Sequence, residues 1–166
     1  MLPPTTNAYV GLGSNLGDRA GNLLLAIRGM IEAGFEVNRL SRIYETEPVE
    51  TFTQPLFLNM VAAVRTNGLS GPEEAMRLLL KVEESLGRIR DVKNGPRTID
   101  LDLLLFGSQT SDTEILKLPH PRFHRRRFVL VPLAELAPQL VHPTLHKTIA
   151  ELLAEVDASE VKLWNL

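Results

Sequence analysis

A short apolar stretch that carries two carboxylates constrains the fold more than any other part of this chain. Residues 98–106 read TIDLDLLLF, and their length and apolar content predict a β-strand. Side chains alternate between the two faces of a strand. The side chains expected to point into a core are those of Ile99, Leu101, Leu103 and Leu105. The opposite face is expected to carry Asp100, Asp102, Leu104 and Phe106.

Two carboxylates on one face of a largely buried strand need a compensating positive charge. Asp100 and Asp102 would lie about 6.5 Å apart, and at an effective dielectric near 20 they would repel each other by about 2.5 kcal/mol. Magnesium is one solution, because it takes one or two carboxylates and completes its coordination with water and substrate phosphates. Pairing with nearby arginines, or a solvated strand end, stays open as an alternative.

The residues that precede this strand favour the metal. Gly95-Pro96 is a turn signal, Arg97 follows it directly, and further cations come just before it at Arg88, Arg90 and Lys93. Carboxylates bracketed by fixed cations suit a metal-bound polyphosphate better than a surface strand.

The remaining pattern predicts one α+β domain. Strands are expected at residues 8–12, 35–46 and 57–65, with helices at 18–33 and 70–87, the second opened by a Ser70–Glu73 capping box. With the strand at 98–106, this order is that of a ferredoxin-like antiparallel sheet with helices on one face. After it we expect a loop at 108–117, a helical turn at 122–127, a short apolar segment at 128–131, and a last helix capped by Thr148 that ends near Val156.

The glycine-rich stretch near the start does not match a nucleotide-binding fingerprint. In Gly11-Leu12-Gly13-Ser14-Asn15-Leu16-Gly17, Leu16 stands where the dinucleotide motif needs its third glycine, and the chain contains no P-loop sequence. These glycines are predicted to form a tight turn between strand and helix. Any ATP would therefore be held by arginines and metal.

Composition excludes several classes of protein. The 166 residues carry a formal net charge of -2, which argues against a general nucleic-acid or membrane binder. The chain has no cysteine, which excludes disulfides and thiolate metal sites. Neither a signal-peptide pattern nor an apolar run of membrane-spanning length is present, so we expect a cytoplasmic protein.

Three stretches resemble the 6-hydroxymethyl-7,8-dihydropterin pyrophosphokinases (2-amino-4-hydroxy-6-hydroxymethyldihydropteridine diphosphokinases). They are GPRTIDLDLLLF at 95–106, GLGSNLGDR at 11–19 and LPHPRFHRRRFVLVPLAELAP at 118–138. The resemblance implies a single domain over residues 1–166, with a core from about 8 to 156, and a ferredoxin-like fold with extra C-terminal elements. It also implies an ATP- and Mg²⁺-dependent diphosphotransferase of folate biosynthesis that forms AMP and the pterin diphosphate.

The same resemblance implies roles for individual residues. The catalytic residues would be Arg90, Arg97, Asp100 and Asp102. Asp100 and Asp102 would hold two Mg²⁺ ions. The ATP side would be lined by Glu83, Arg90, Arg97, His120 and Arg126. The pterin would be bound by Thr46, Pro48, Val49, Phe57, Asn59 and Phe128.

The strand at 57–65 supports part of this assignment without the resemblance. Phe57 and Asn59 share one of its faces, whereas Met60 lies on the other. A half-buried amide needs matched donors and acceptors, which the flat polar edge of a heterocycle supplies.

Two other functions fit parts of the pattern. A Mg²⁺-dependent nucleotidyltransferase would also use paired strand carboxylates. An RNA-binding sheet needs exposed aromatic residues on its central strands, and aromatics make up only 5% of this chain. We therefore expect ATP and the pterin alcohol as the partners, neither nucleic acid nor membrane, and a monomer.

Overall fold

The structure, a computed structural model, describes residues 6–48, 55–87 and 98–165. Its elements in chain order are β1 (Asn7–Ser14), α1 (Arg19–Glu32), β2 (Glu36–Leu40), β3 (Tyr44–Thr46), β4 (Phe57–Arg65), α2 (Pro72–Ser85), β5 (Asp100–Phe106), β6 (Ser111–Asp112), β7 (Lys117–Leu118), the 3-10 helix η1 (Phe123–Arg125), α3 (Arg127–Leu136), α4 (Ile149–Glu155) and β8 (Val161–Leu163). The predicted residues Val49, Arg90 and Arg97 lie outside the described residues.

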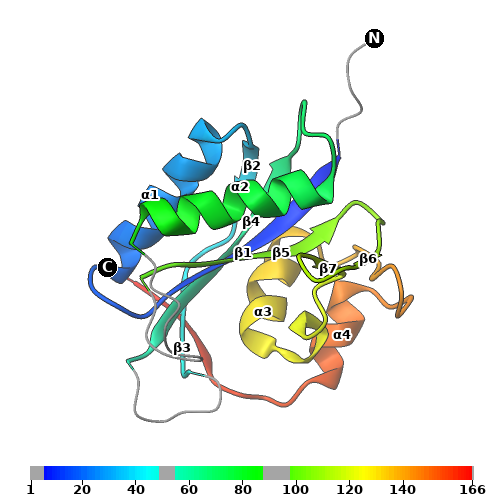
Figure 1. Cartoon of the computed structure of the whole chain (residues 1–166). Helices are drawn as coiled ribbons and strands as arrows, with labels where there is room; N and C mark the ends of the chain where they lie inside the picture. Colours follow the sequence, from blue (N-terminus) through cyan, green and yellow to red (C-terminus); the bar gives the residue numbers. More distant parts are fainter. Residues whose placement is uncertain (1–5, 49–54, 88–97, 166) are drawn as a thin grey trace.

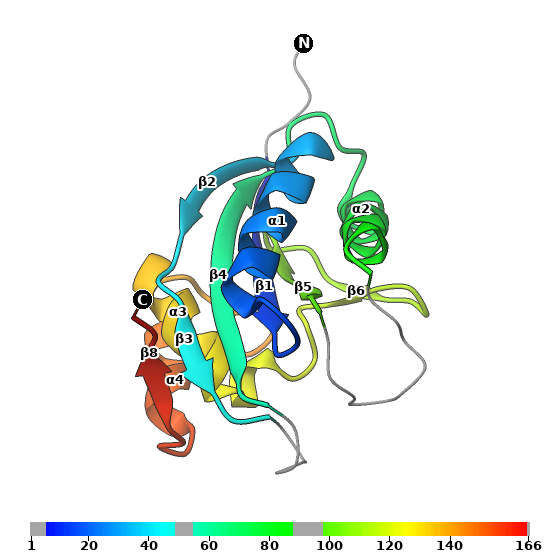
Figure 2. The same ribbon diagram turned by 90° about the vertical axis from the view of Figure 1, so that its left-hand side faces the viewer.

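One antiparallel sheet organises the molecule. Its strands follow the order β5-β1-β4-β3-β8, and β2 also pairs with β4 (Figures 1 and 2). The inner part of this order is that of a ferredoxin-like sheet, so the predicted fold class is confirmed. The strand β8, which pairs with β3 near the end of the chain, was not predicted.

Helices cover both faces of the sheet. α1 and α2 pack on one face, and the extra C-terminal helices α3 and α4 pack on the other (Figure 1). Helix α1 begins as the sequence indicates, because the Asp18 side chain accepts a hydrogen bond of 3.0 Å from the Gly21 N–H. Gly34, at a φ of 110°, ends that helical segment in a conformation that favours glycine.

Each face has its own hydrophobic core, which we call the first and the second core. The first core joins α1 and α2 to the sheet through buried side chains that include Val10, Leu23, Met30, Met60, Leu79 and Leu101. The second core joins α3 and α4 to the other face through Val61, Leu104, Leu105, Leu130, Leu133 and Ile149.

A β-bulge changes the predicted alternation of β5. Tyr9 pairs with Leu105 and Val10 with Leu103, so Leu104 is the extra residue. Leu105 therefore lies in the second core and Phe106 in the first, and the predicted faces of these two residues are wrong. Asp100 and Asp102 precede the bulge and keep the predicted face.

The predicted strand at 35–46 is two strands. Residues 41–43 interrupt it, because the Ser41 hydroxyl accepts a hydrogen bond of 2.9 Å from the Val61 N–H, and the Arg42 N–H donates to Glu135. The segment thus bonds to both β4 and α3, and β2 and β3 each pair separately with β4.

The predicted helix boundaries are partly right. Thr148 and Glu151 form the expected capping box of α4. At α2, the N-cap is Gly71, and Glu74, rather than Glu73, accepts from the Ser70 N–H. The segment at 128–131 belongs to α3, and the loop at 108–117 contains the β6–β7 hairpin. No helix in the described parts of the chain is both long and apolar enough to span a membrane.

A buried histidine organises the loop between α3 and α4. The His142 side chain is only 3% exposed, and its Nδ1 accepts hydrogen bonds from the backbone N–H groups of Thr144 (3.3 Å) and Leu145 (3.1 Å). Its ring stacks near Phe123, with ring centres 5.3 Å apart. Burial, followed by the neighbouring His124 and His146, lowers the pKa of His142.

This histidine predicts a pH-dependent stability. A pKa below the unfolded value means that the folded state favours neutral His142, so its stabilisation is complete above about pH 6.5 and declines as the pH falls through that value, by at most about 1.4 kcal/mol per pH unit. In His142→Asn the amide oxygen replaces Nδ1 as acceptor and does not titrate. Urea unfolding between pH 7.5 and 5 should therefore show a shallower loss of stability for this variant than for the native chain.

The control is His146→Asn, at an exposed position whose φ of 57° asparagine tolerates. This variant removes only the smallest of the three causes that lower the pKa of His142, so it should keep most of the native pH dependence. Equal slopes for the native chain and His142→Asn would contradict the prediction.

Candidate active site

Strand register brings the polar residues of four strands together on the α3 side of the sheet. Tyr44 on β3 pairs with Asn59 on β4, Asn59 with Gly13 on β1, and Gly13 with Asp100 on β5. These residues form one row across the sheet. Because neighbouring strands lie about 4.8 Å apart, the Asn59 and Asp100 backbones are separated by about 10 Å.

The predicted register of β4 is confirmed. Leu58 and Met60 lie in the first core, so Phe57 and Asn59 face the opposite side. Asn59 is 9% exposed, and Phe57 is half-buried. Thr46 pairs with Phe57 on the neighbouring strand and is itself buried. An amide and an aromatic ring thus lie next to each other on this face.

A hydrogen bond fixes the direction of the Asn59 amide. Its Nδ2 donates to the Thr46 hydroxyl at 2.6 Å. Its Oδ1 faces Gly13, since a Cβ added to Gly13 would lie 2.8 Å from that oxygen. The amide oxygen is therefore directed toward β1, in the direction of Asp100 along the row.

Gly13 is a residue of β1, so its predicted place in the turn is wrong, whereas Gly11 lies in β1 as the strand predicted at 8–12 requires. The turn glycine is Gly17, with a φ of 71°. At Gly13 a side chain would collide with the Asn59 amide, whereas a Cβ at Gly11 would only touch Leu104, at 3.6 Å. Gly13 thus leaves the sheet face between Asn59 and Asp100 without a side chain.

The two carboxylates share this face. Asp100 and Asp102 are half-buried, and Leu101 between them points into the first core. Oxygen donors two residues apart on one strand fit a hard cation such as Mg²⁺. The described residues contain no cluster of three or more potential metal ligands, so in this part of the chain the protein offers these two carboxylates.

Glu83 contacts the same strand. Its carboxylate is 1% exposed and accepts a hydrogen bond of 2.7 Å from the Leu101 N–H. Because β5 is an edge strand, this contact supplies a partner to a backbone group without one in the sheet. Glu83 thereby anchors the residue between the two carboxylates. Its predicted contact with ATP stays a prediction.

His120 also bonds to the backbone of β5. Its backbone N–H donates a hydrogen bond to the Leu104 carbonyl at 3.0 Å. Its side-chain Nδ1 accepts one from the Arg122 backbone N–H at 3.2 Å. Burial, followed by the charge of Arg126, lowers the pKa of His120 to about 4, although Asp100 opposes the shift. At neutral pH His120 is therefore uncharged, and its Nε2 carries the proton.

Arg126 and Phe128 stand at the start of α3. Arg126 is the N-cap residue, and its guanidinium lies 5.7 Å from the centre of the Phe128 ring. Phe128 is half-buried and packs against the second core. The charges of Arg126 and Asp100 both act on the pKa of His120, so both side chains lie near the His120 ring.

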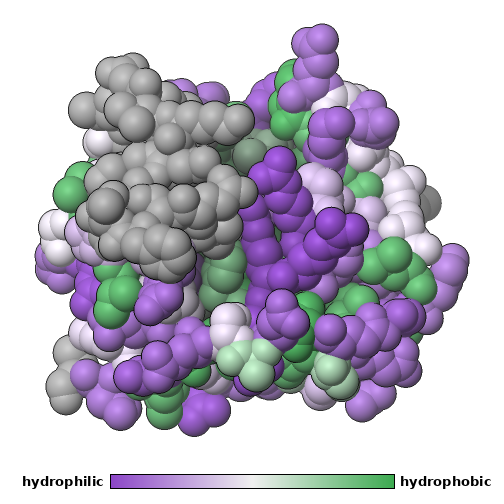
Figure 3. Space-filling view, turned by 90° about the horizontal axis from the view of Figure 1, so that it is seen from below, coloured by the Kyte–Doolittle hydropathy of each residue, from purple (hydrophilic) through white to green (hydrophobic). Residues whose placement is uncertain are grey.

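The surface seen from below in Figure 1 has a polar centre. Hydrophilic side chains gather there (Figure 3).

Four of the predicted site residues contribute no distance or contact to the group described above: Pro48, Val49, Arg90 and Arg97. Pro48 follows β3 and is half-buried, and the other three lie outside the described residues. Sequence reasoning missed Gly13 as part of the floor and the Thr46 side chain as a partner of Asn59. Residues 9, 11 and 13 lie on the same face of β1. Had the predicted strand been extended to Ser14, this alternation would have placed Gly13 on the correct face.

Comparisons with known proteins agree on one family. A family model described as 7,8-dihydro-6-hydroxymethylpterin-pyrophosphokinase (HPPK) matches residues 9–138. A Bacillus subtilis protein named 2-amino-4-hydroxy-6-hydroxymethyldihydropteridine pyrophosphokinase is 42% identical over 95% of this chain and 90% of its own length. A Synechocystis protein of the same name is 42% identical over 93% of this chain and 78% of its own.

Longer proteins contain a similar region. The folic acid synthesis protein fol1 of Pneumocystis carinii is 38% identical over 93% of this chain, which corresponds to 20% of fol1. The crystal structure of Plasmodium falciparum HPPK-DHPS with pteroate superimposes with a TM-score of 0.71 at 17% identity, over 92% of this chain and 42% of that one. At this identity the structural likeness supports the fold alone.

Proposed function

The chain belongs to the 7,8-dihydro-6-hydroxymethylpterin-pyrophosphokinase family, and from that membership we infer the reaction that it catalyses. It transfers the diphosphoryl group of ATP to the hydroxymethyl group of 6-hydroxymethyl-7,8-dihydropterin, in folate biosynthesis. The pterin hydroxyl oxygen bonds to the β-phosphorus, the bond between that phosphorus and the oxygen bridging to the α-phosphorus breaks, and AMP leaves. The hydroxyl proton passes to solvent.

One observation supports placing this reaction on the α3 side of the sheet. In the row Asn59–Gly13–Asp100, the residues that carry a polar amide and a carboxylate have backbones about 10 Å apart, with no side chain between them. A pterin that is hydrogen-bonded to Asn59 would extend toward a triphosphate bound near Asp100. Holding both substrates in line supplies much of the catalysis of a phosphoryl-type transfer.

We propose that Asp100 and Asp102 hold two Mg²⁺ ions. Bound Mg²⁺ would neutralise the charge that develops on the transferred phosphates. The chain's own contribution is two half-buried carboxylates on a strand that Glu83 anchors at Leu101. This anchor fixes the backbone between the two ligands, so both carboxylates keep their common face.

Basic and neutral donors are proposed to hold the triphosphate. Arg126 offers a planar guanidinium, and His120 offers the N–H of its Nε2. Because His120 is uncharged at neutral pH, it contributes a hydrogen bond and no net charge. Arg90 and Arg97 are also included, because the family resemblance implies that they line the ATP side.

The pterin is proposed to lie between Phe57 and Phe128. Stacking between two aromatic rings suits a flat heterocycle. Asn59 and the chain around Thr46, Pro48 and Val49 would bond its polar edge. We also propose that the protein acts as a monomer.

Product analysis tests the reaction. With ATP and the pterin alcohol, equal amounts of AMP and pterin diphosphate should form. The rival nucleotidyl transfer would release pyrophosphate instead, and its appearance with a pterin–AMP adduct would overturn the assignment.

The metal site predicts a large loss of activity. Asp100→Asn or Asp102→Asn should reduce Mg²⁺-dependent transfer about a thousandfold, because a metal contributes several kcal/mol and each 1.36 kcal/mol is tenfold in rate. Asp112→Asn, in the exposed β6–β7 hairpin, is the matched control and should keep native turnover. Near-native turnover in either site variant would exclude the proposed metal ligand.

The open floor at Gly13 predicts a specific loss of pterin binding. In Gly13→Ala the new methyl group would lie 2.8 Å from the Asn59 oxygen and displace the amide. Overpacking of this kind costs about 1–3 kcal/mol, so pterin affinity should fall about tenfold or more. Titration of the pterin in the presence of a non-hydrolysable ATP analogue measures this loss.

The neighbouring glycine provides the control for this substitution. Gly11→Ala adds the same methyl group to the same strand, at ordinary contact distance from Leu104. Its pterin affinity should stay within about twofold of native, which is less than 0.5 kcal/mol. Equal losses in the two variants would show that a general change in β1, rather than the Asn59 amide, is responsible.

A further inference from the structure

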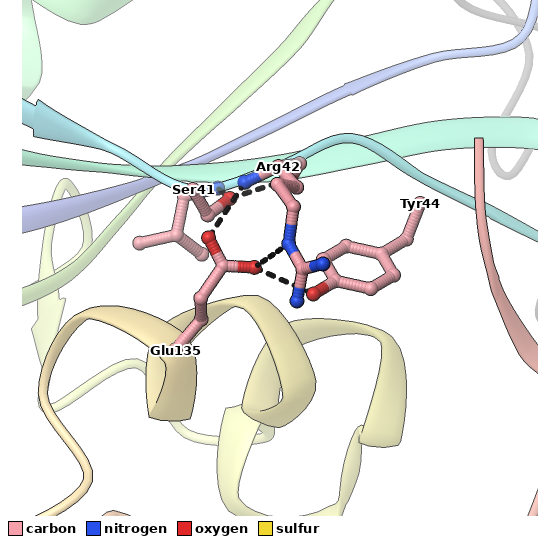
Figure 4. Close-up of polar contacts among 5 residues, drawn as sticks. Ser41, Arg42, Tyr44 and Glu135 are labelled. Atoms are coloured by element: carbon pink, nitrogen blue, oxygen red, sulfur yellow. Dashed lines mark hydrogen bonds and ion pairs between the residues drawn. The ribbon is translucent and has the colours of Figure 1, made fainter. Parts of the chain in front are cut away.

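A polar network joins α3 to the strand segment before β3, far from the carboxylates. Glu135, in the last turn of α3, accepts three hydrogen bonds: from the Arg42 N–H at 2.8 Å, from the Arg42 Nε at 3.0 Å and from the Tyr44 hydroxyl at 2.6 Å. Figure 4 shows Glu135 reaching from the helix to this segment, where Arg42 and Tyr44 converge on its carboxylate.

The position of Glu135 is unfavourable for the helix itself. A carboxylate in the last turn lies at the negative end of the helix dipole, where a cation would be stabilising. Burial raises the pKa of the Glu135 carboxyl, but donation from Tyr44 and Arg42 outweighs burial and leaves the pKa below its usual value. The anion is therefore stabilised by its contacts with the β3 segment.

Helix geometry connects Glu135 to Phe128, the aromatic ring on α3 that is proposed to contact the pterin. Phe128 precedes Glu135 by seven residues, and two turns of an α-helix contain 7.2 residues. The two side chains therefore project from the same side of α3, about 10 Å apart along its axis. A contact that fixes Glu135 against the sheet also fixes the distance of Phe128 from the sheet.

Strand geometry connects Tyr44 to the sheet side of the proposed pterin site, the Thr46–Asn59 pair. Tyr44 is 6% exposed, pairs with Asn59 across the sheet, and precedes by two residues Thr46, which orients the Asn59 amide. The strand β3 spans only three residues, and β8 pairs with its outer edge. A displacement of Tyr44 would therefore be transmitted to Thr46.

We propose that Glu135 and Tyr44 are positioning residues for the pterin site. By bonding α3 to β3 they set the separation between Phe128 on the helix and the Thr46–Asn59 pair on the sheet. This inference rests on the proposed pterin site, and it adds two residues that contact neither substrate nor metal.

A double-mutant cycle tests the proposal. In Tyr44→Phe and in Glu135→Gln, the Kd for the pterin alcohol, titrated with a non-hydrolysable ATP analogue present, should rise about five- to tenfold. The Kd of the double variant should stay within about twofold of that of the weaker-binding single variant, because Tyr44→Phe removes one of the three contacts that Glu135→Gln weakens. The Kd for the ATP analogue and kcat at saturating pterin should stay within about twofold of native.

A variant of similar stability provides the control. Thr148→Ala removes the N-cap of α4, which packs against α3, and should lower the melting temperature by about 2–4 °C. Its pterin Kd should be native.

Three results would overturn the inference. Pterin affinity within twofold of native in both Tyr44→Phe and Glu135→Gln would show a merely structural network. A rise in the Kd of pterin and ATP analogue alike, or the same rise in Thr148→Ala, would show general destabilisation. Failure of the native chain itself to bind the pterin would instead contradict the proposed function.

Discussion

The register of β3, β4, β1 and β5 is the constraint on which the candidate site depends. Side chains change face with every residue, so a slip of one position in β4 would replace Asn59 with a core residue such as Met60. The bulge at Leu104 shows how one extra residue changes the face to which the following side chains point. An extra residue before Asp100 would have turned the carboxylates toward α2, whereas after Asp102 it reorients only Leu105 and Phe106.

The two faces of the sheet divide the work of folding and binding. On the face covered by α1 and α2, the strands contribute apolar side chains that are almost completely buried. The other face combines the second core with a row of polar side chains and a glycine. The unfavourable terms, two neighbouring carboxylates and a buried amide, are thus confined to one face, and the opposite face supplies apolar burial that offsets them.

The sequence predicted the elements whose signals are local. Asp18 and Thr148 cap their helices as expected, and the side chains of β4 alternate between the two faces of the sheet as predicted. The bulge could not be predicted, because three consecutive leucines fit either face of the sheet equally well. The break between β2 and β3 depends on Glu135, 93 residues after Arg42, and no local pattern reveals such a contact. Gly13 was misassigned for a related reason: its role is the absence of a side chain between two others.

Charge on the polar face has a simple origin. Burial and Arg126 keep His120 neutral, so protonation of this histidine adds no positive charge near pH 7. Positive charge there comes from arginines, which stay ionised at any physiological pH. A phosphate-binding site built in this way keeps its electrostatic attraction constant across the neutral range, and its hydrogen-bond donors do not depend on a titrating group. The geometry of the proposed site then depends on two contacts between helices and sheet: Glu135 of α3 bonds Tyr44 of β3, and Glu83 of α2 bonds the backbone of β5. In the proposed site, Glu135 thus positions Phe128 on its helix, and Glu83 positions the strand backbone between Asp100 and Asp102.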